Sequence, residues 1–160
     1  MMKNDVEKNI LQNVVEKAIV KEVMGLKLAK LLIERVERKA SQVGVRAVIA
    51  VTDSSGRPIA VHCMDGAYHG SFDVAVNKAY TVTAFQMPTK NLAELCKPGA
   101  DLYGLQFSNN GKVMILGGGE PLMIGDTMIG ALAVSGGTAA QDSELAEYGK
   151  EILKEVIECP

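Results

Sequence analysis

Two short apolar segments joined by a turn place the strongest limit on how this chain can fold. Residues 45–52 read VRAVIAVT and residues 58–64 read PIAVHCM, and both are rich in the β-branched side chains that favour strands. The five residues between them, DSSGR, have the Asp, Ser and Gly composition of a hairpin turn. We predict an antiparallel pair here, because parallel strands need a much longer connection.

A second group of strand-like segments lies closer to the C-terminus. KVMILG (112–117), PLMI (121–124) and TMIGALAVS (127–135) are separated by the turn signals GGGE and GD. These short turns again favour antiparallel pairing. We therefore predict three further strands, which gives a sheet of about five strands.

Segments with helical periodicity flank both groups of strands. Residues 26–42, 71–85 and 138–157 carry apolar side chains at helical spacing. Ser71 is the expected N-cap of the middle helix, and a Thr-x-x-Gln capping box opens the last one. The predicted order is α-β-β-α-β-β-β-α, an α+β domain over residues 23–160 with one sheet flanked by helices.

One more helix is predicted ahead of this domain, in residues 1–22. Val6, Ile10, Val14 and Ala18 follow one another at a spacing of four residues among charged side chains, which is typical of an amphipathic helix. Two roles remain open for it. It is either a targeting segment that binds a partner, or a helix of the core or of an oligomer interface.

The composition of the chain excludes several classes of protein. Seventeen Lys and Arg face nineteen Asp and Glu, for a net charge of −2, so there is no basic excess for nucleic acid. No apolar run is long enough to span a membrane, and the N-terminus does not resemble a signal peptide. Cys63, Cys96 and Cys159 form no CxxC pair, which suits reduced thiols. We expect a cytoplasmic protein that binds neither nucleic acid nor membranes.

Two glycine-containing stretches resemble catalytic motifs but lack the residues that those motifs need. Residues 104–113, GLQFSNNGKV, have the wrong spacing for a phosphate loop, so no nucleotide is expected. AVSGG resembles a nucleophile elbow around Ser135, but both histidines precede that serine. We predict a glycine turn instead, where Gly136 and Gly137 could offer backbone N–H groups to an anion at a helix N-terminus.

The two histidines of the chain, His62 and His69, lie seven residues apart. His62 falls in a predicted strand, where a lone histidine is more often a half-buried packing residue than a ligand. His69 falls in a turn before a helix, where functional residues are common. Their spacing does not suit a structural zinc site, whereas an axial ligand to a tetrapyrrole metal requires only one donor. Either histidine is a candidate axial ligand.

Polar residues on the predicted helix over residues 71–85 supply further candidates. Asp73, Asn77 and Thr81 recur every four residues and would form a stripe, with Lys78 beside it. This stripe is either a solvent-facing surface or one wall of a ligand site in which Lys78 meets a carboxylate. If the protein is an enzyme, Asp65 or Asp73 would be the general base, and the glycine turns would hold a small carboxylate or hydroxy acid.

Six sequence blocks resemble one known family. In chain order they are MDGA (64–67), S.D.A..KA.T...F (71–85), MPT (87–89), PG..LYGL (98–105), GGG.PL (117–122) and IGA..VSGGT..QD (129–142). They are similar to the GlcG/HbpS-like family, which also forms the C-terminal domain of PduO proteins. The resemblance covers about residues 26–157.

The resemblance implies a profilin-like three-layer fold, assembly into homo-oligomers, and binding of haem or a related tetrapyrrole such as a corrinoid. Thr81 matches a threonine on the haem side of the secreted members. The acidic iron-binding pattern of those members has no clear counterpart, and the chain has no adenosyltransferase domain. Residues 1–22 are similar to peptides that direct enzymes into bacterial microcompartments, where they would contact a shell or enzyme partner.

These observations favour a tetrapyrrole-binding accessory protein that supports diol, glycerol or glycolate metabolism. The candidate ligand-binding residues are His69, His62, Lys78, Thr81, Gly136 and Gly137. The alternatives are an enzyme acting on a small carboxylate and a structural assembly subunit.

Overall fold

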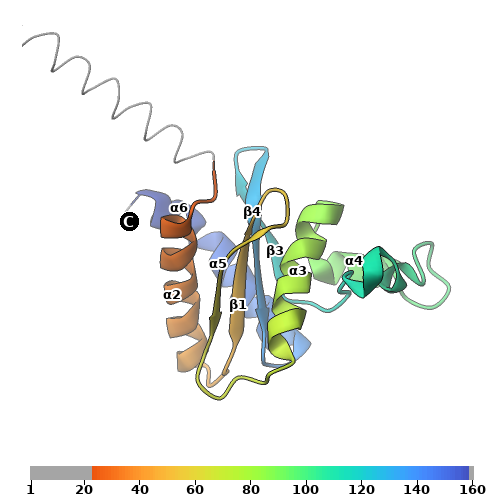
Figure 1. The fold of residues 1–160 in the computed structure, drawn as a ribbon, viewed down its shortest axis with the longest axis horizontal. Coiled ribbons are helices and arrows are strands. Elements are labelled where there is room, and N and C mark those ends of the chain that lie inside the picture. The colour runs from red at the N-terminus through yellow and green to blue at the C-terminus, as the bar shows by residue number, and fades with distance from the viewer. Residues whose placement is uncertain (1–22, 159–160) are drawn as a thin grey trace, which may run out of the picture.

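The computed structural model describes residues 23–158, which build one four-stranded antiparallel sheet with helices on both faces (Figure 1). The predicted helix in residues 1–22 lies outside the described residues. The elements in chain order are α2 (Leu26–Gln42), β1 (Val48–Asp53), β2 (Pro58–Cys63), α3 (Ser71–Phe85), α4 (Thr89–Leu95), the 3₁₀ turns η1 (Leu105–Phe107) and η2 (Asn109–Gly111), β3 (Gly119–Ile124), β4 (Thr127–Ser135), α5 (Ala139–Glu151) and α6 (Leu153–Glu158).

The strands lie in the order β2-β1-β4-β3, and each pairs with its neighbours in antiparallel fashion. The predicted hairpin is confirmed: β1 pairs with β2, with Ile49 opposite His62. β4 then pairs with β1 on one side and β3 on the other, so the two strand groups of the sequence share one sheet.

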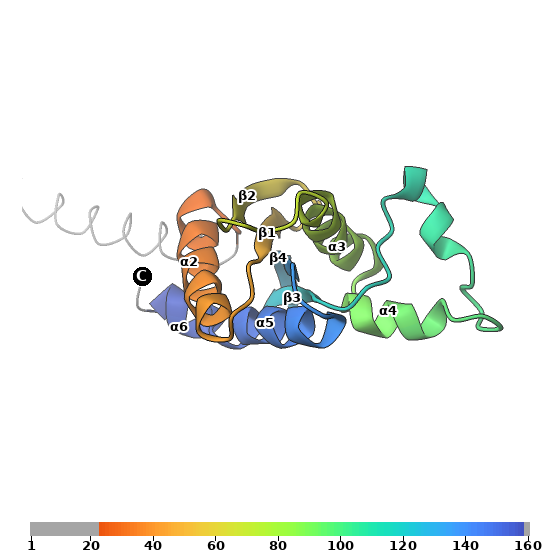
Figure 2. The ribbon, with the colours of Figure 1, turned by 90° about the horizontal axis from the view of Figure 1, so that it is seen from below.

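Helices cover the two faces of the sheet in different ways (Figure 2). On one face, α2, α5 and α6 enclose a core of large aliphatic side chains that includes Leu32, Ile33 and Leu132. On the other face, α3 packs through Ala75 and Ala79 onto small residues of β1 and β4. Small side chains let a helix and a sheet approach closely. The predicted α+β class with three layers is confirmed.

The sheet has four strands in the described part of the chain, where the sequence suggested about five. The segment KVMILG (112–117) is the difference, because it does not join the sheet. Val113 packs instead with Leu92 and Cys96 in a separate small core beside α4. The backbone N–H of Met114 donates to Thr81 Oγ1 on α3 at 2.8 Å, which fixes this segment against a helix.

The observed helix ends agree with the predicted ones in one case and differ from them in two. The capping box at α5 is confirmed, with the Thr138 N–H donating to Gln141 Oε1 and the Gln141 N–H donating to Thr138 Oγ1. The predicted N-cap at Ser71 is wrong, because Gly70 holds that position and no side-chain cap bond forms. The predicted helix over residues 138–157 is divided into α5 and α6 at Ile152.

Residues 89–116, which we call the arm, extend from the body of the molecule beyond α3 (Figure 2). The arm contains α4, both 3₁₀ turns and the return segment to β3. Several of its large apolar side chains are exposed, and they are Leu95, Leu102, Tyr103, Phe107 and Leu116. None of the described helices is both long and apolar enough to cross a bilayer.

Candidate functional site

Loops from three parts of the chain meet at one end of the sheet, the lower end in Figure 1. There the loop between β2 and α3 lies beside the turn between β4 and α5. Together with residues that follow α2, they line a hollow of about 410 Å³. Its lining residues are Gly44, Val45, Arg46, Gly66, Tyr68, Gly136, Gly137 and Gln141. The hollow therefore brings the predicted glycine turn together with the loop that carries His69.

His69 lies in the last turn before α3, and its side chain is exposed. Its carbonyl accepts the Phe72 N–H at 3.3 Å, which fixes the backbone of the turn against the helix. No hydrogen bond or ion pair to the His69 ring is found within residues 23–158. Its sequence neighbours Tyr68 and Phe72 are also exposed, by 75% and 45%. Within the described residues, an imidazole without a hydrogen-bond partner thus lies in a short stretch of chain that also carries two exposed aromatic side chains.

His62 has a different environment, although it comes only seven residues earlier. It lies on β2, and its Nδ1 atom is 2.9 Å from Glu37 Oε1 of α2. Both side chains are about one-third exposed. Its register partner Ile49 belongs to the core beneath α2, so His62 faces that layer while α3 covers the opposite face. The structure does not bring the two histidines together.

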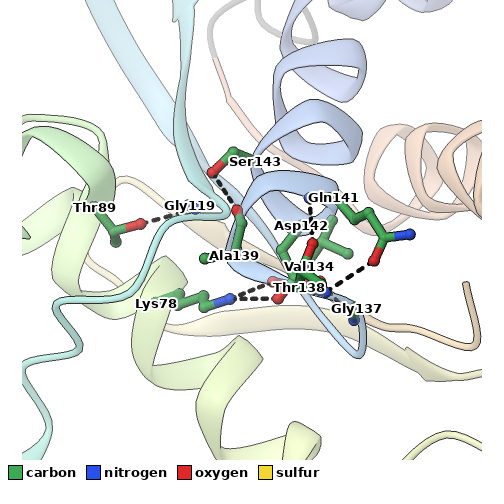
Figure 3. A network of polar contacts seen from close by, with 10 residues as sticks. All are labelled: Lys78, Thr89, Gly119, Val134, Gly137, Thr138, Ala139, Gln141, Asp142 and Ser143. Carbon is green, nitrogen blue, oxygen red and sulfur yellow. Dashed lines mark hydrogen bonds and ion pairs between the residues drawn. The ribbon is translucent and has the colours of Figure 1, made fainter.

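Lys78 is buried, with 1% of its surface exposed, and does not reach the hollow. Its Nζ atom donates to Asp142 Oδ2 at 2.9 Å and to the carbonyl of Val134 at 2.8 Å (Figure 3). Burial lowers the pKa of Lys78, and the hydrogen bond to Asp142 and its negative charge act in the opposite direction. Gly118 leaves room for this pair, since a Cβ there would lie 3.0 Å from Lys78 Nζ. The expected partner of Lys78, a ligand carboxylate, is replaced by the protein's own carboxylate.

Backbone N–H groups of the glycine turn before α5 are likewise bonded to side chains of the protein itself. The Gly137 N–H donates to Asp142 Oδ1 at 2.9 Å, and the Thr138 N–H donates to Gln141 (Figure 3). The Gly137 N–H is one of the two backbone donors that we expected to hold an anion at this helix N-terminus. Asp142 supplies that anion from within the chain, so the Gly137 N–H is already engaged, while Gly136 remains in the lining of the hollow.

Thr81 is fully buried and connects two elements. Its hydroxyl donates to the carbonyl of Asn77 at 2.7 Å and accepts the Met114 N–H at 2.8 Å. Both contacts are internal, so the hydroxyl anchors the return of the arm to α3. The predicted polar stripe of α3 is therefore divided: Asp73 is exposed, whereas Thr81 faces the protein interior.

The two candidate bases lie apart from this network. Asp65 is exposed and lines a separate hollow with Glu37 and Arg38 of α2. Asp73 is exposed in the first turn of α3. In the described part of the chain, no three His, Cys, Asp or Glu side chains are grouped so that they could hold a metal ion. A catalytic role for either aspartate remains a prediction.

Sequence reasoning missed four residues of this region: Arg46, Tyr68, Phe72 and Asp142. The aromatic residues had a usable signal, because Tyr68 and Phe72 flank a histidine in a polar loop. Arg46 had none, since an arginine before a strand is ordinary. Asp142 follows the capping box by one residue and reads as a helix-dipole residue, which hides its pairing with a lysine 64 positions earlier.

Comparison with known proteins gives one family match that covers most of the chain. The family described as "Haem degrading protein HbpS-like" matches residues 24–151. A 15.0 kDa protein from the dhaT–dhaS intergenic region of Citrobacter freundii is 39% identical over 131 residues, which are 82% of this chain and 92% of that protein. The corrinoid adenosyltransferase PduO of Salmonella typhimurium is 37% identical over 109 residues, which are 68% of this chain but only 32% of PduO.

Solved structures agree with the family match. A crystal structure of the Klebsiella pneumoniae protein ORFY is 34% identical, with a TM-score of 0.80 over 82% of this chain and 90% of that one. A crystal structure of a PduOC–haem complex is 31% identical, with a TM-score of 0.77 over 81% of this chain and 94% of that one.

Proposed function

The chain belongs to the HbpS-like family, as its six sequence blocks indicated, and on this premise we propose that it binds haem through His69. The similarity to a PduOC–haem complex supports haem as the first ligand to test. The site we assign is the end of the sheet where the loop before α3 borders the hollow at Arg46.

One observation carries the choice of His69 over His62. The His69 ring is exposed and has no partner within residues 23–158, whereas the His62 ring is paired with Glu37 at 2.9 Å. An axial ligand must present a free imidazole nitrogen to the iron. The contact with Glu37 leaves the His62 Nε2 atom free, and a carboxylate on the other nitrogen is common in metal-ligating histidines. His62 is nevertheless only about one-third exposed on the α2 side of the sheet, whereas His69 is exposed beside the hollow, so we choose His69 as the donor.

The surroundings of His69 fit the other parts of a haem group. Tyr68 and Phe72 offer exposed aromatic surface for the apolar ring edge. Arg46 lines the adjoining hollow with Tyr68, and a guanidinium pairs well with propionate carboxylates. We assign the propionate contact to Arg46 and not to Lys78, because Lys78 is already paired with Asp142. A bound haem would supply one-electron or oxygen chemistry at its iron.

The names of two relatives support a setting for this function. The C. freundii relative comes from a dhaT–dhaS region, and PduO is a corrinoid adenosyltransferase. We propose an accessory role in the cytoplasm beside diol or glycerol metabolism, within a microcompartment, with a corrinoid as the second ligand to test. The match covers about a third of PduO, so adenosyl transfer is not part of this proposal. We also propose that the chain assembles into homo-oligomers through the exposed apolar residues of the arm.

The test is a visible-absorption titration of the full chain with haemin and, separately, with cobalamin. We expect a sharp haem band that saturates near one equivalent and that is lost in His69→Ala. The matched control is His62→Ala, which removes the other imidazole and should leave the band in place. Arg46→Met should weaken haem binding without changing the band position, because it removes a propionate partner and not the iron ligand.

Two results would contradict the proposal. Loss of the band in His62→Ala alone would move the site to the α2 face of the sheet. Absorbance that never saturates in the unmodified protein would reject haem binding, and small carboxylates would then be screened as substrates.

A further inference from the structure

An apolar groove lies at the end of the molecule opposite His69. It is formed by the hairpin between β3 and β4 and by one side of α6, and its volume is about 350 Å³. We call it the hairpin groove, and its lining residues are Met123, Ile124, Gly125, Leu153, Lys154, Ile157 and Glu158. It contains no residue of the proposed haem site.

The hairpin groove exposes side chains that usually avoid water. Met123 is 39% exposed, and Ile124 and Ile157 are half-buried at the edge of the main core. Leu153 forms its floor and is buried. Contiguous apolar surface of this kind commonly marks a contact site. Within residues 23–158 it is left uncovered.

The described chain begins beside this groove. Met24 is buried in the same core as Ile129 and Leu153. α2 is joined to α6 by an ion pair between Arg35 and Glu155 at 2.9 Å, and Figure 1 shows the first turn of α2 next to α6. Val23 is 57% exposed, which adds apolar surface where the preceding segment enters. Any residues that come before Val23 therefore start within reach of the groove.

The segment that comes before Val23 has the composition to cover such a groove. Residues 1–22 lie outside the part of the chain that matches the family. A helix over residues 10–19 would place apolar side chains on one face and Asn and Glu on the other; the apolar ones are Ile10, Leu11, Val14, Val15 and Ala18. Twenty-two helical residues would extend for about 33 Å.

We propose that residues 1–22 of the same chain dock in the hairpin groove through this apolar face. The contact does not have to be strong, because a covalent connection gives the segment an effective concentration of about millimolar at the groove. The proposal is independent of haem binding. It also competes with the prediction that this segment binds a shell or enzyme partner.

The test measures backbone amide exchange in the full chain by mass spectrometry. Leu11→Asp/Val14→Asp puts two charges on the apolar face of the segment. We expect amides in residues 120–126 and 152–158 to exchange about tenfold faster in this variant, because local protection is lost when a covering segment leaves. The matched control, Asn9→Asp/Asn13→Asp, adds the same charge to the opposite face and should leave these amides unchanged.

Further measurements separate docking from its alternatives. Backbone amide exchange in β1 reports on the folding of the whole domain. It should be the same in Leu11→Asp/Val14→Asp and in Asn9→Asp/Asn13→Asp. Met123→Asp alters the groove directly, and its effect on thermal unfolding should not add to that of Leu11→Asp/Val14→Asp if the two surfaces touch. Unchanged exchange at the groove, or additive effects, would overturn the proposal. Protection that is lost on dilution would assign the groove to the segment of a second copy.

Discussion

At the scale of single residues, Lys78 and Asp142 form a buried ion pair that joins three elements. Lys78 belongs to α3, Asp142 to the first turn of α5, and the Val134 carbonyl that completes the contact belongs to β4. Asp142 also accepts the Gly137 N–H. Each charge is satisfied only while the other is present, so single and double substitutions should have very different effects.

We predict that Lys78→Met lowers the free energy of unfolding by about 3–5 kcal/mol, because it leaves Asp142 charged and buried without its cation. Adding Asp142→Asn removes that charge and keeps an oxygen for the Gly137 N–H. The double variant should therefore regain much of the loss. Urea denaturation measures all three proteins. A double variant as unstable as the sum of its single substitutions would contradict a paired role.

The same pair predicts how stability depends on pH. Burial lowers the pKa of Lys78 below its ordinary value of 10.5, despite the opposing effect of Asp142. Between that lowered pKa and 10.5, the unfolded chain binds more protons than the folded protein. The contribution of Lys78 to the free energy of unfolding should therefore rise with pH across this window. The rise should be absent from the Lys78→Met/Asp142→Asn protein.

At the scale of elements, Thr81 decides where the arm returns to the body. Its hydroxyl is the acceptor for the Met114 N–H, in a segment that belongs to no strand. Without that acceptor, the amide would have to find water or remain unpaired. The hydroxyl therefore positions a whole segment.

We predict that Thr81→Val lowers the free energy of unfolding by about 1–3 kcal/mol, the usual effect of leaving a buried donor without a partner. Thr81→Ser is the matched control, because it keeps the hydroxyl and should cost less. Amide exchange at Met114 should be faster in Thr81→Val alone. Equal exchange in both variants would show that the hydroxyl does not hold the segment.

Elements were predictable where local pattern and tertiary contacts agree. The β1–β2 hairpin and the α5 capping box depend on neighbours in sequence, so their residues were sufficient to predict them. KVMILG (112–117) has the composition of a strand, but contacts with distant helices hold it outside the sheet. The Met114 N–H donates to Thr81 of α3, and the Val113 side chain packs beside α4. The spacing of Lys78 and Thr81 showed that they lie on a helix, but not that this side of α3 faces inward.

At the scale of the whole molecule, the arm is the part of the described chain where exposed large apolar side chains are most numerous. Tyr103 is 62% exposed and Phe107 is 81% exposed, and exposed apolar side chains grouped on one part of the surface commonly mark a protein contact. The family resemblance led us to expect a homo-oligomer, and the arm offers the apolar surface for it. A second copy of the chain is the partner we propose.

We predict that Tyr103→Ser/Phe107→Ser reduces the assembly to protomers of about 17.1 kDa. Val43→Ser removes an apolar side chain that is 47% exposed and lies outside the arm, and it should leave the assembly unchanged. Sedimentation velocity compares the three proteins. If the unmodified chain already sediments as a protomer, the oligomer proposal is wrong.

The two ends of the described chain leave the molecule at the same pole, beside α6, and the loop before α3 lies at the other pole (Figure 1). A fluorophore, surface anchor or carrier protein joined at either end would consequently stand clear of the proposed haem site. Protein attached to a surface through either chain end would therefore keep the loop before α3 exposed to solvent. Immobilised protein should keep the ligand affinity of protein in solution.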